Sequence, residues 1–189
     1  MSDLSAVLAG AAGAELASAL DAASETDRVA AIQAMTRDQQ KRLWSVTSAS
    51  PHPDGELIDA AARDGIQRFA GRNTLGVFSR FEKRFFRAEG GIFGMNQHAL
   101  MPLIGPGYFG VQARPSGGLL FGYRQLPAVA PAGWPTVRSN DRGLARSVYG
   151  ALVDEVVWVS RDVLIGAAFR DGRPLDSYFV LARTGSVQG

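Results

Sequence analysis

The stretch LVDEVVWVSRDVLIGAAFRDGRPLDSYFVLAR, residues 152–183, decides the fold. It contains three runs rich in Val, Leu, Phe and Tyr, at 152–159, 162–170 and 177–183, with turn residues between them. The last two runs flank RDGR, residues 170–173, whose Asp-Gly pair is the strongest local hairpin signal in the chain. This segment therefore predicts an antiparallel β-meander.

Three more strand-like runs precede it, IFGMNQHAL (92–100), YFGVQARP (108–115) and GLLFGYRQL (118–126). Together the runs predict about six antiparallel strands. A sheet of this size avoids bare edges by closing into a small barrel of lipocalin-like architecture. A strongly curved open sheet packed on a helix is the alternative.

Residues 1–65 are rich in Ala and Leu and predict a helical N-terminal region. TRDQ, residues 36–39, fits a capping box, in which the threonine hydroxyl and the glutamine amide satisfy free backbone groups at a helix start. We therefore expect two regions, the helical one at 1–65 and a β-rich domain at 66–189, in an α+β fold.

The run FSRFEKRFFR, residues 78–87, alternates rings with positive charges. As a strand it would have two mixed faces, whereas at 100° per residue its rings and its basic side chains fall on opposite sides. This pattern predicts an amphipathic helix at about 74–87, packed on the sheet. Nucleic-acid binding is disfavoured, because bases stack on rings that are exposed among basic groups. Contact with a membrane surface or a partner is the less favoured alternative.

Residues 127–150 contain three prolines, which exclude a central strand. Asn140 or Asp141 could cap a short helix through Leu144 and Val148. A long segment of this kind, joining strands of a compact domain, predicts a flap over a binding site.

Composition narrows the class of protein. The chain has 189 residues, 46% of them hydrophobic, which suits one domain with a core of its own. It has no cysteine, no apolar run long enough to span a membrane and no basic leader before an apolar run, so a cytoplasmic location is expected. Acidic side chains are concentrated in residues 1–65 and basic ones in the rest. The two halves could attract each other or present a partner surface, which leaves a homodimer open.

Cofactor and metal motifs are weak. GPGYFG, residues 105–110, matches G-x-G-x-x-G, but a strand-like run follows it where a dinucleotide site needs a helix. The chain has two histidines, His52 and His98, and no cysteine. We therefore expect no cofactor and no metal site.

Candidate site residues are polar groups on otherwise apolar strands. His98 and Asn96 would share one strand face, where a histidine can orient a ligand or move a proton. Asp154 and Glu155 are adjacent in an apolar run, so either face that turns inward carries an acid; a structural ion pair, with Arg124 as one possible partner, is the alternative. Tyrosine hydroxyls on strands with glycine neighbours could fix the polar end of a ligand, as at Tyr108, Tyr123 and Tyr178.

The leading hypothesis is therefore a protein that binds a small, largely apolar or aromatic molecule inside the barrel, with Asn96, Tyr108, Arg124 and Tyr178 as ligand contacts. The rival is a cofactor-independent cyclase, isomerase or lyase in the same cavity, with His98, Tyr123 and Glu155 as acid–base residues. A protein–protein module that uses the opposite charges of the two halves is a third class.

Overall fold

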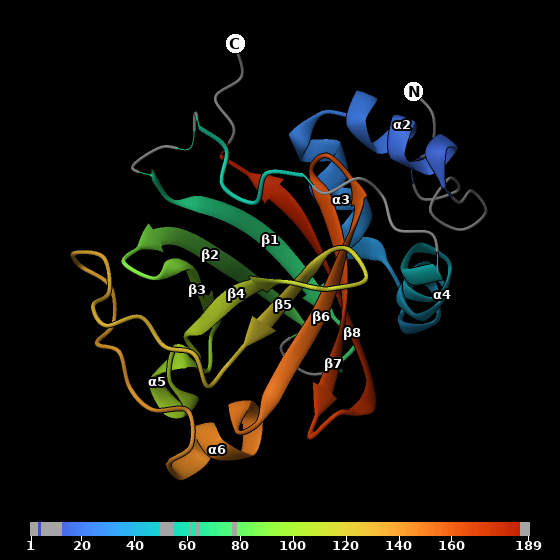
Figure 1. Ribbon diagram of the computed structural model, residues 1–189. Helices are drawn as coiled ribbons and strands as arrows, with labels where there is room; N and C mark the ends of the chain where they lie inside the picture. Colours follow the sequence, from blue (N-terminus) through green and yellow to red (C-terminus); the bar gives the residue numbers. More distant parts are fainter. Residues whose placement is uncertain are drawn as a thin grey trace.

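The protein is described by a computed structural model at residues 4, 13–49, 55–60, 62, 65–76 and 79–185. It is a closed antiparallel barrel with N-terminal helices packed on one side (Figure 1). Each strand pairs with its neighbours in sequence, and β1 closes the barrel by pairing with β8. The strands are β1 (Gln67–Asn73), β2 (Arg80–Ala88), β3 (Gly91–Gln97), β4 (Phe109–Ala113), β5 (Leu119–Gly122), β6 (Leu152–Ser160), β7 (Val163–Arg170) and β8 (Arg173–Thr184). The predicted α+β fold is confirmed, with eight strands in place of about six.

The hairpin predicted at RDGR is present between β7 and β8. Arg170 pairs with Arg173, and the two residues between them, Asp171 and Gly172, have φ angles of 50° and 74°. Positive φ at both central positions is the condition for the two-residue turn whose twist matches that of the strands.

The predicted helix at about 74–87 is wrong: the chain forms the strand β2 from Arg80 to Ala88, and residues 77 and 78 lie outside the described ones. β2 pairs with β1 and β3 along its length. Its buried inner row contains Lys83 and Phe85, with Phe81 partly buried beside them. Both mixed faces have a structural cause: the inner row contains buried Lys83, and the outer row contains Phe86, which packs against Trp134.

Three helices cover one side of the barrel: α2 (Ala14–Ala22), α3 (Glu25–Ala34) and α4 (Arg37–Ala49). They pack on β6, β7 and β8, and α3 also contacts β1 (Figure 1). The capping box at the start of α4 is confirmed, because the Thr36 backbone N–H donates to Gln39 Oε1 at 2.8 Å and the Gln39 N–H donates to Thr36 Oγ1 at 3.3 Å.

This helical layer explains why β6 is apolar on both faces. Val156 and Trp158 belong to the interior of the barrel, whereas Val157 and Val159 join the core shared with the helices. When both faces of a strand are covered, its sequence is a nearly continuous run of apolar residues.

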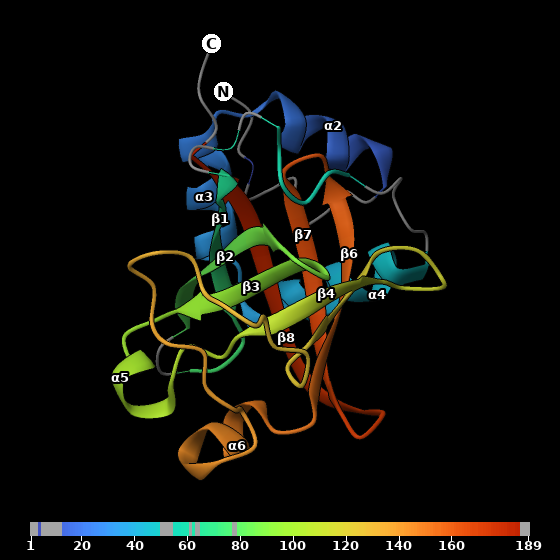
Figure 2. The ribbon, with the colours of Figure 1, turned by 60° about the vertical axis from the view of Figure 1, so that its left-hand side comes forward.

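The two ends of the barrel differ. At one end, Leu57 and Ile58 cover an interior filled with aromatic rings. Buried Arg183 holds this closed end by donating to Glu56 O at 2.6 Å and to Asp162 Oδ1 at 2.9 Å. The short helices α5 (Met101–Ile104) and α6 (Gly143–Tyr149) lie at the other end, away from α2 and α3 (Figure 2). We call that end the mouth.

The segment predicted to be a flap divides into two parts. Residues up to 142 run outside the barrel, where Trp134 packs edge-on against Phe86 and Asn140 donates to the backbone oxygens of Tyr108 and Tyr123, both at 2.7 Å. The predicted helix through Leu144 and Val148 is present as α6, but its N-cap is Arg142, without a side-chain cap. The flap motion and the division of the chain at residue 65 stay predictions. Within the described ranges, no helix has the length and apolar character needed to cross a membrane.

Candidate functional site

The barrel mouth contains a cavity of about 530 Å³, which we call the mouth cavity. Its walls come from strand ends and from both short helices. Apolar side chains form most of the wall, among them Phe81, Leu152, Ala168 and Phe179, together with Ile104 from α5. Arg170 also lines it and donates to Ser147 O and Val148 O of α6 at 3.1 and 3.0 Å, which fixes that helix at the rim.

A cluster of four buried polar side chains also lines the mouth cavity. Lys83 comes from β2, Asn96 from β3 and Asp154 from β6, whereas Tyr123 directly follows β5; each is 5% exposed or less. Lys83 Nζ donates to Asn96 Oδ1 and to Tyr123 OH, both at 2.8 Å, and lies 3.5 Å from Asp154 Oδ2.

The remaining bonds close this network. The Tyr123 hydroxyl donates to Asp154 Oδ2 at 3.1 Å, and Asn96 Nδ2 donates to Gly107 O at 3.2 Å. Every polar side chain of the cluster therefore has a partner, as buried polar groups require.

Aromatic rings surround the amine of Lys83. Its Nζ lies 4.6 Å from the ring centroid of Phe109, 5.1 Å from that of Phe179 and 5.7 Å from that of Phe81. These distances allow cation–π attraction, which helps to hold a positive charge away from water.

Glycine positions these rings. Gly94 pairs directly with Phe109 and Gly166 with Phe179 across neighbouring strands, and Gly71 pairs with Phe81 in the same way. Each ring lies so close over its glycine that a Cβ there would overlap it; at Gly94 the distance would be 2.5 Å to Phe109 Cζ. The three cross-strand glycines thus give the rings around Lys83 the space they occupy.

Burial shifts the acid–base behaviour of the cluster. It lowers the pKa of Lys83 to about 8, although the negative charge of Asp154 acts in the opposite direction. Burial also raises the pKa of Asp154 and raises that of Tyr123 well above its ordinary value. Shifted pKa values of this kind, in an apolar cavity, are typical of binding and catalytic sites.

His98 belongs to an outer layer of the same site. Its Nε2 lies 2.9 Å from the Tyr149 hydroxyl, and the Tyr149 ring stacks on Tyr123 with centroids 5.1 Å apart and planes 10° apart. Burial, and then the charge of Lys83, lower the pKa of His98, which favours the neutral imidazole.

Four of the residues expected at the site line the mouth cavity: Asn96, His98, Tyr123 and Tyr178. Tyr178 lies at the rim, where its hydroxyl donates to Asp176 Oδ1 at 3.1 Å.

Three expected residues lie elsewhere. Tyr108 packs beneath the 127–142 segment and donates to Pro135 O at 2.7 Å. Arg124 is exposed, with its Nε 3.8 Å from Asp141 Oδ1. Glu155 pairs with Arg114 at 2.9 Å, away from the residues that line the cavity. The acid at the mouth cavity is therefore Asp154, because β6 turns that row of side chains inward.

Lys83 lines the mouth cavity but is not among the residues expected from the sequence. The signal was present in FEKRFF, where a strand reading puts a lysine in the apolar row. A lysine in an inward-facing apolar row argues against assigning a strand, because burying its charge is unfavourable. The assignment is reasonable only where that row lines a cavity with polar partners for the lysine.

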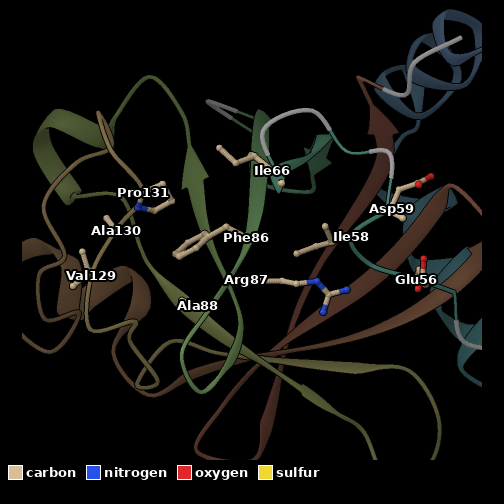
Figure 3. Close-up of a pocket in the computed structure, with 12 residues that line it drawn as sticks. Glu56, Ile58, Asp59, Ile66, Phe86, Arg87, Ala88, Val129, Ala130 and Pro131 are labelled. Atoms are coloured by element: carbon tan, nitrogen blue, oxygen red, sulfur yellow. The ribbon is translucent and has the colours of Figure 1, made fainter.

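A second hollow lies on the outside of the barrel, between the end of β2, residues 56, 58–60 and 65–66, and residues 129–131, with a volume of about 600 Å³. Figure 3 shows Phe86 pointing toward Pro131 on one side and Arg87 toward Glu56 on the other. Glu56, Asp59 and Arg87 are exposed, so this hollow has no buried polar group comparable to Lys83. The mouth cavity is the better candidate.

Among the described residues, no three His, Asp or Glu side chains lie close enough together to hold a metal ion. Comparison of the chain with models of protein families, with curated proteins and with solved structures gave no significant match. The function is therefore inferred from the geometry of the mouth cavity.

Proposed function

We propose that the protein binds a small, largely apolar molecule in the mouth cavity. The observation that carries this proposal is the position of the Lys83–Asn96–Tyr123–Asp154 cluster on the wall of an otherwise apolar cavity. A cavity with apolar walls and a few placed polar groups is the usual form of a small-molecule site, and about 530 Å³ lies within the usual size range. A lipocalin-like carrier likewise holds its ligand inside a β-barrel.

The direct experiment is native mass spectrometry of the purified full chain, followed by denaturing extraction and screening of apolar compounds. We expect a bound small molecule that is lost on denaturation, or stabilisation of the protein by added apolar compounds. The same spectrum reports whether the protein is a monomer or the homodimer that the sequence leaves open.

A matched pair of variants makes this experiment specific to the cavity. Ala168 lines the cavity and pairs directly with Asp154, whereas Ala113 is exposed at the end of β4. Ala168→Phe should abolish binding and Ala113→Phe should preserve it. Equal binding by both variants, or no bound compound in wild type and no stabilisation by any compound tested, would contradict the proposal.

A cofactor-independent isomerase, cyclase or lyase is the second candidate. The pKa shifts of Lys83 and Asp154 support it, because burial moves both groups toward neutral pH, where acid–base groups are most effective. The Tyr123 hydroxyl is hydrogen-bonded to both of them. An enzyme would lose turnover of the bound compound in Tyr123→Phe while still binding it; a carrier would show no turnover to lose.

A further inference from the structure

The chain contains two lysines, Lys41 and Lys83, and uses arginine for its other basic side chains. Lys41 is exposed on α4 and pairs with Asp176 Oδ1 at 2.9 Å. Lys83 is 2% exposed in the folded protein and lines the mouth cavity. One of two lysines is therefore placed where a bound molecule would meet its amine.

Charge pairing does not explain the choice of lysine. The other buried ion pairs of the described residues use arginine: Arg28 and Arg183 contact Asp162 at 3.2 and 2.9 Å. Lys83 Nζ lies 3.5 Å from Asp154, longer than a charge-assisted hydrogen bond. Lysine differs from arginine in that its amine can lose a proton and act as a nucleophile.

We propose that Lys83 forms an imine with an aldehyde or ketone carbonyl carried by the apolar ligand. This inference rests on the proposed binding function, and it assigns a chemical class to the ligand: an apolar or aromatic carbonyl compound that fits the mouth cavity.

The amine meets the conditions for this reaction. With a pKa of about 8, roughly a quarter of Lys83 is neutral at pH 7.5, against roughly one part in a thousand for an ordinary lysine. An amine desolvated in an apolar site is one recognised form of activated lysine nucleophile. The rings of Phe109 and Phe179 can then stabilise the protonated imine as they stabilise the ammonium.

The neighbours can move the protons that the reaction requires. The nitrogen lone pair of neutral Lys83 adds to the carbonyl carbon, and a proton passes from nitrogen to the carbonyl oxygen to give the carbinolamine. The Tyr123 hydroxyl, 2.8 Å from Nζ and 3.1 Å from Asp154 Oδ2, connects the amine to the carboxyl group for this transfer. The carbinolamine then loses its hydroxyl group and the remaining N–H proton as water. One carbonyl and one amine give one imine and one water, without oxidation or reduction.

The test is reductive trapping on the full-length wild-type protein. trans-Cinnamaldehyde and octanal are each incubated with the protein and sodium cyanoborohydride, and peptide mapping locates the secondary amine. We expect labelling of Lys83 at least about tenfold faster than that of Lys41, from the difference in neutral amine. Lys83→Arg should lose the fast label and Lys41→Arg should keep it. Because the wild-type map alone reports the site, the test does not depend on the folding of either variant.

The corresponding alcohols, cinnamyl alcohol and 1-octanol, separate the imine from binding. They have the same skeletons and no carbonyl, and their binding is measured by native mass spectrometry. An alcohol that binds while its aldehyde labels Lys83 no faster than Lys41 would overturn the imine and leave the binding function standing. Alcohols and aldehydes that neither bind nor label Lys83 would overturn both.

Discussion

Lys83 and Asp154 face each other from β2 and β6 with 3.5 Å between Nζ and Oδ2, and both contact the hydroxyl of Tyr123. These residues are far apart in sequence and are brought together only because the sheet closes into a barrel. Their charges stabilise each other, yet burial destabilises both charged forms. The balance between these effects sets the titration of the pair and its contribution to stability at each pH.

The titration of Lys83 can be followed directly. In protein labelled with ¹³C-lysine, the two side chains should give two sets of NMR signals. We expect that of Lys83 to titrate at about pH 8, and that of Lys41 at a pKa raised by its bond to Asp176. Asp154→Asn removes the negative charge that raises the pKa of Lys83, so its midpoint should move lower still. A Lys83 midpoint near 10.5, or one unchanged in Asp154→Asn, would contradict this account of the cluster.

The same pKa makes stability depend on pH. The pKa of Lys83 is about 8 in the folded protein and about 10.5 in the unfolded chain, so the unfolded chain binds the extra proton between these values. The resulting destabilisation is complete below pH 8 and disappears as pH rises through 10.5. The free energy of unfolding should therefore rise from pH 8 to 9.5, by about 1 to 2 kcal/mol.

Lys83→Met is the control for this rise. Urea unfolding at the two pH values should show this increase in the free energy of unfolding of wild type. Lys83→Met should lack it, so wild type should gain stability relative to the variant as pH rises. Parallel changes in the two proteins would show that another group is responsible.

The error at residues 74–87 has a physical cause. Helical periodicity separated the rings of this run from its charges, whereas a strand required a lysine among inward-facing phenylalanines. Sequence rules assume that a charge avoids the core, and they fail where a strand carries a charge into a site. The meander at 152–183 was predictable because its Asp-Gly turn and apolar runs agree with each other.

The lining of the mouth cavity was predictable in part. Asn96, His98 and Tyr123 were found as polar groups on apolar strands, and all three line the mouth cavity. Glu155 could not be told from Asp154, because both faces of β6 are covered, one by the barrel interior and one by the helices. That layer of helices is a tertiary feature that the alternation along one strand does not reveal.

Gly166→Ala should disturb both stability and the site. Its added methyl would overlap the ring of Phe179, and overpacking of this kind costs about 1–3 kcal/mol. Because Phe179 lies 5.1 Å from Lys83 Nζ, the Lys83 NMR signals should also move.

Gly76→Ala is the control, since a Cβ there meets nothing within 4 Å. It should leave the urea midpoint and the Lys83 signals unchanged; an equal loss of stability in both variants would argue against the role given to the cross-strand glycines.

Asp162→Ala should be among the most destabilising substitutions outside the site. The Asp162 carboxylate forms ion pairs with Arg28 of α3 at 3.2 Å and with Arg183 of β8 at 2.9 Å, and both arginines are buried. Removing the carboxylate leaves two buried cations without their counter-charge, and breaking a buried pair in this way costs about 3–5 kcal/mol. Asp176→Asn also removes a negative charge between two basic groups, Arg37 and Lys41, but those groups are about half exposed. Asparagine tolerates the φ of 48° at this position and water replaces the pairing, so the urea midpoint of Asp176→Asn should stay close to that of wild type. A comparable loss in the two variants would mean that the Arg28–Asp162–Arg183 contact does not join the helical layer to the barrel.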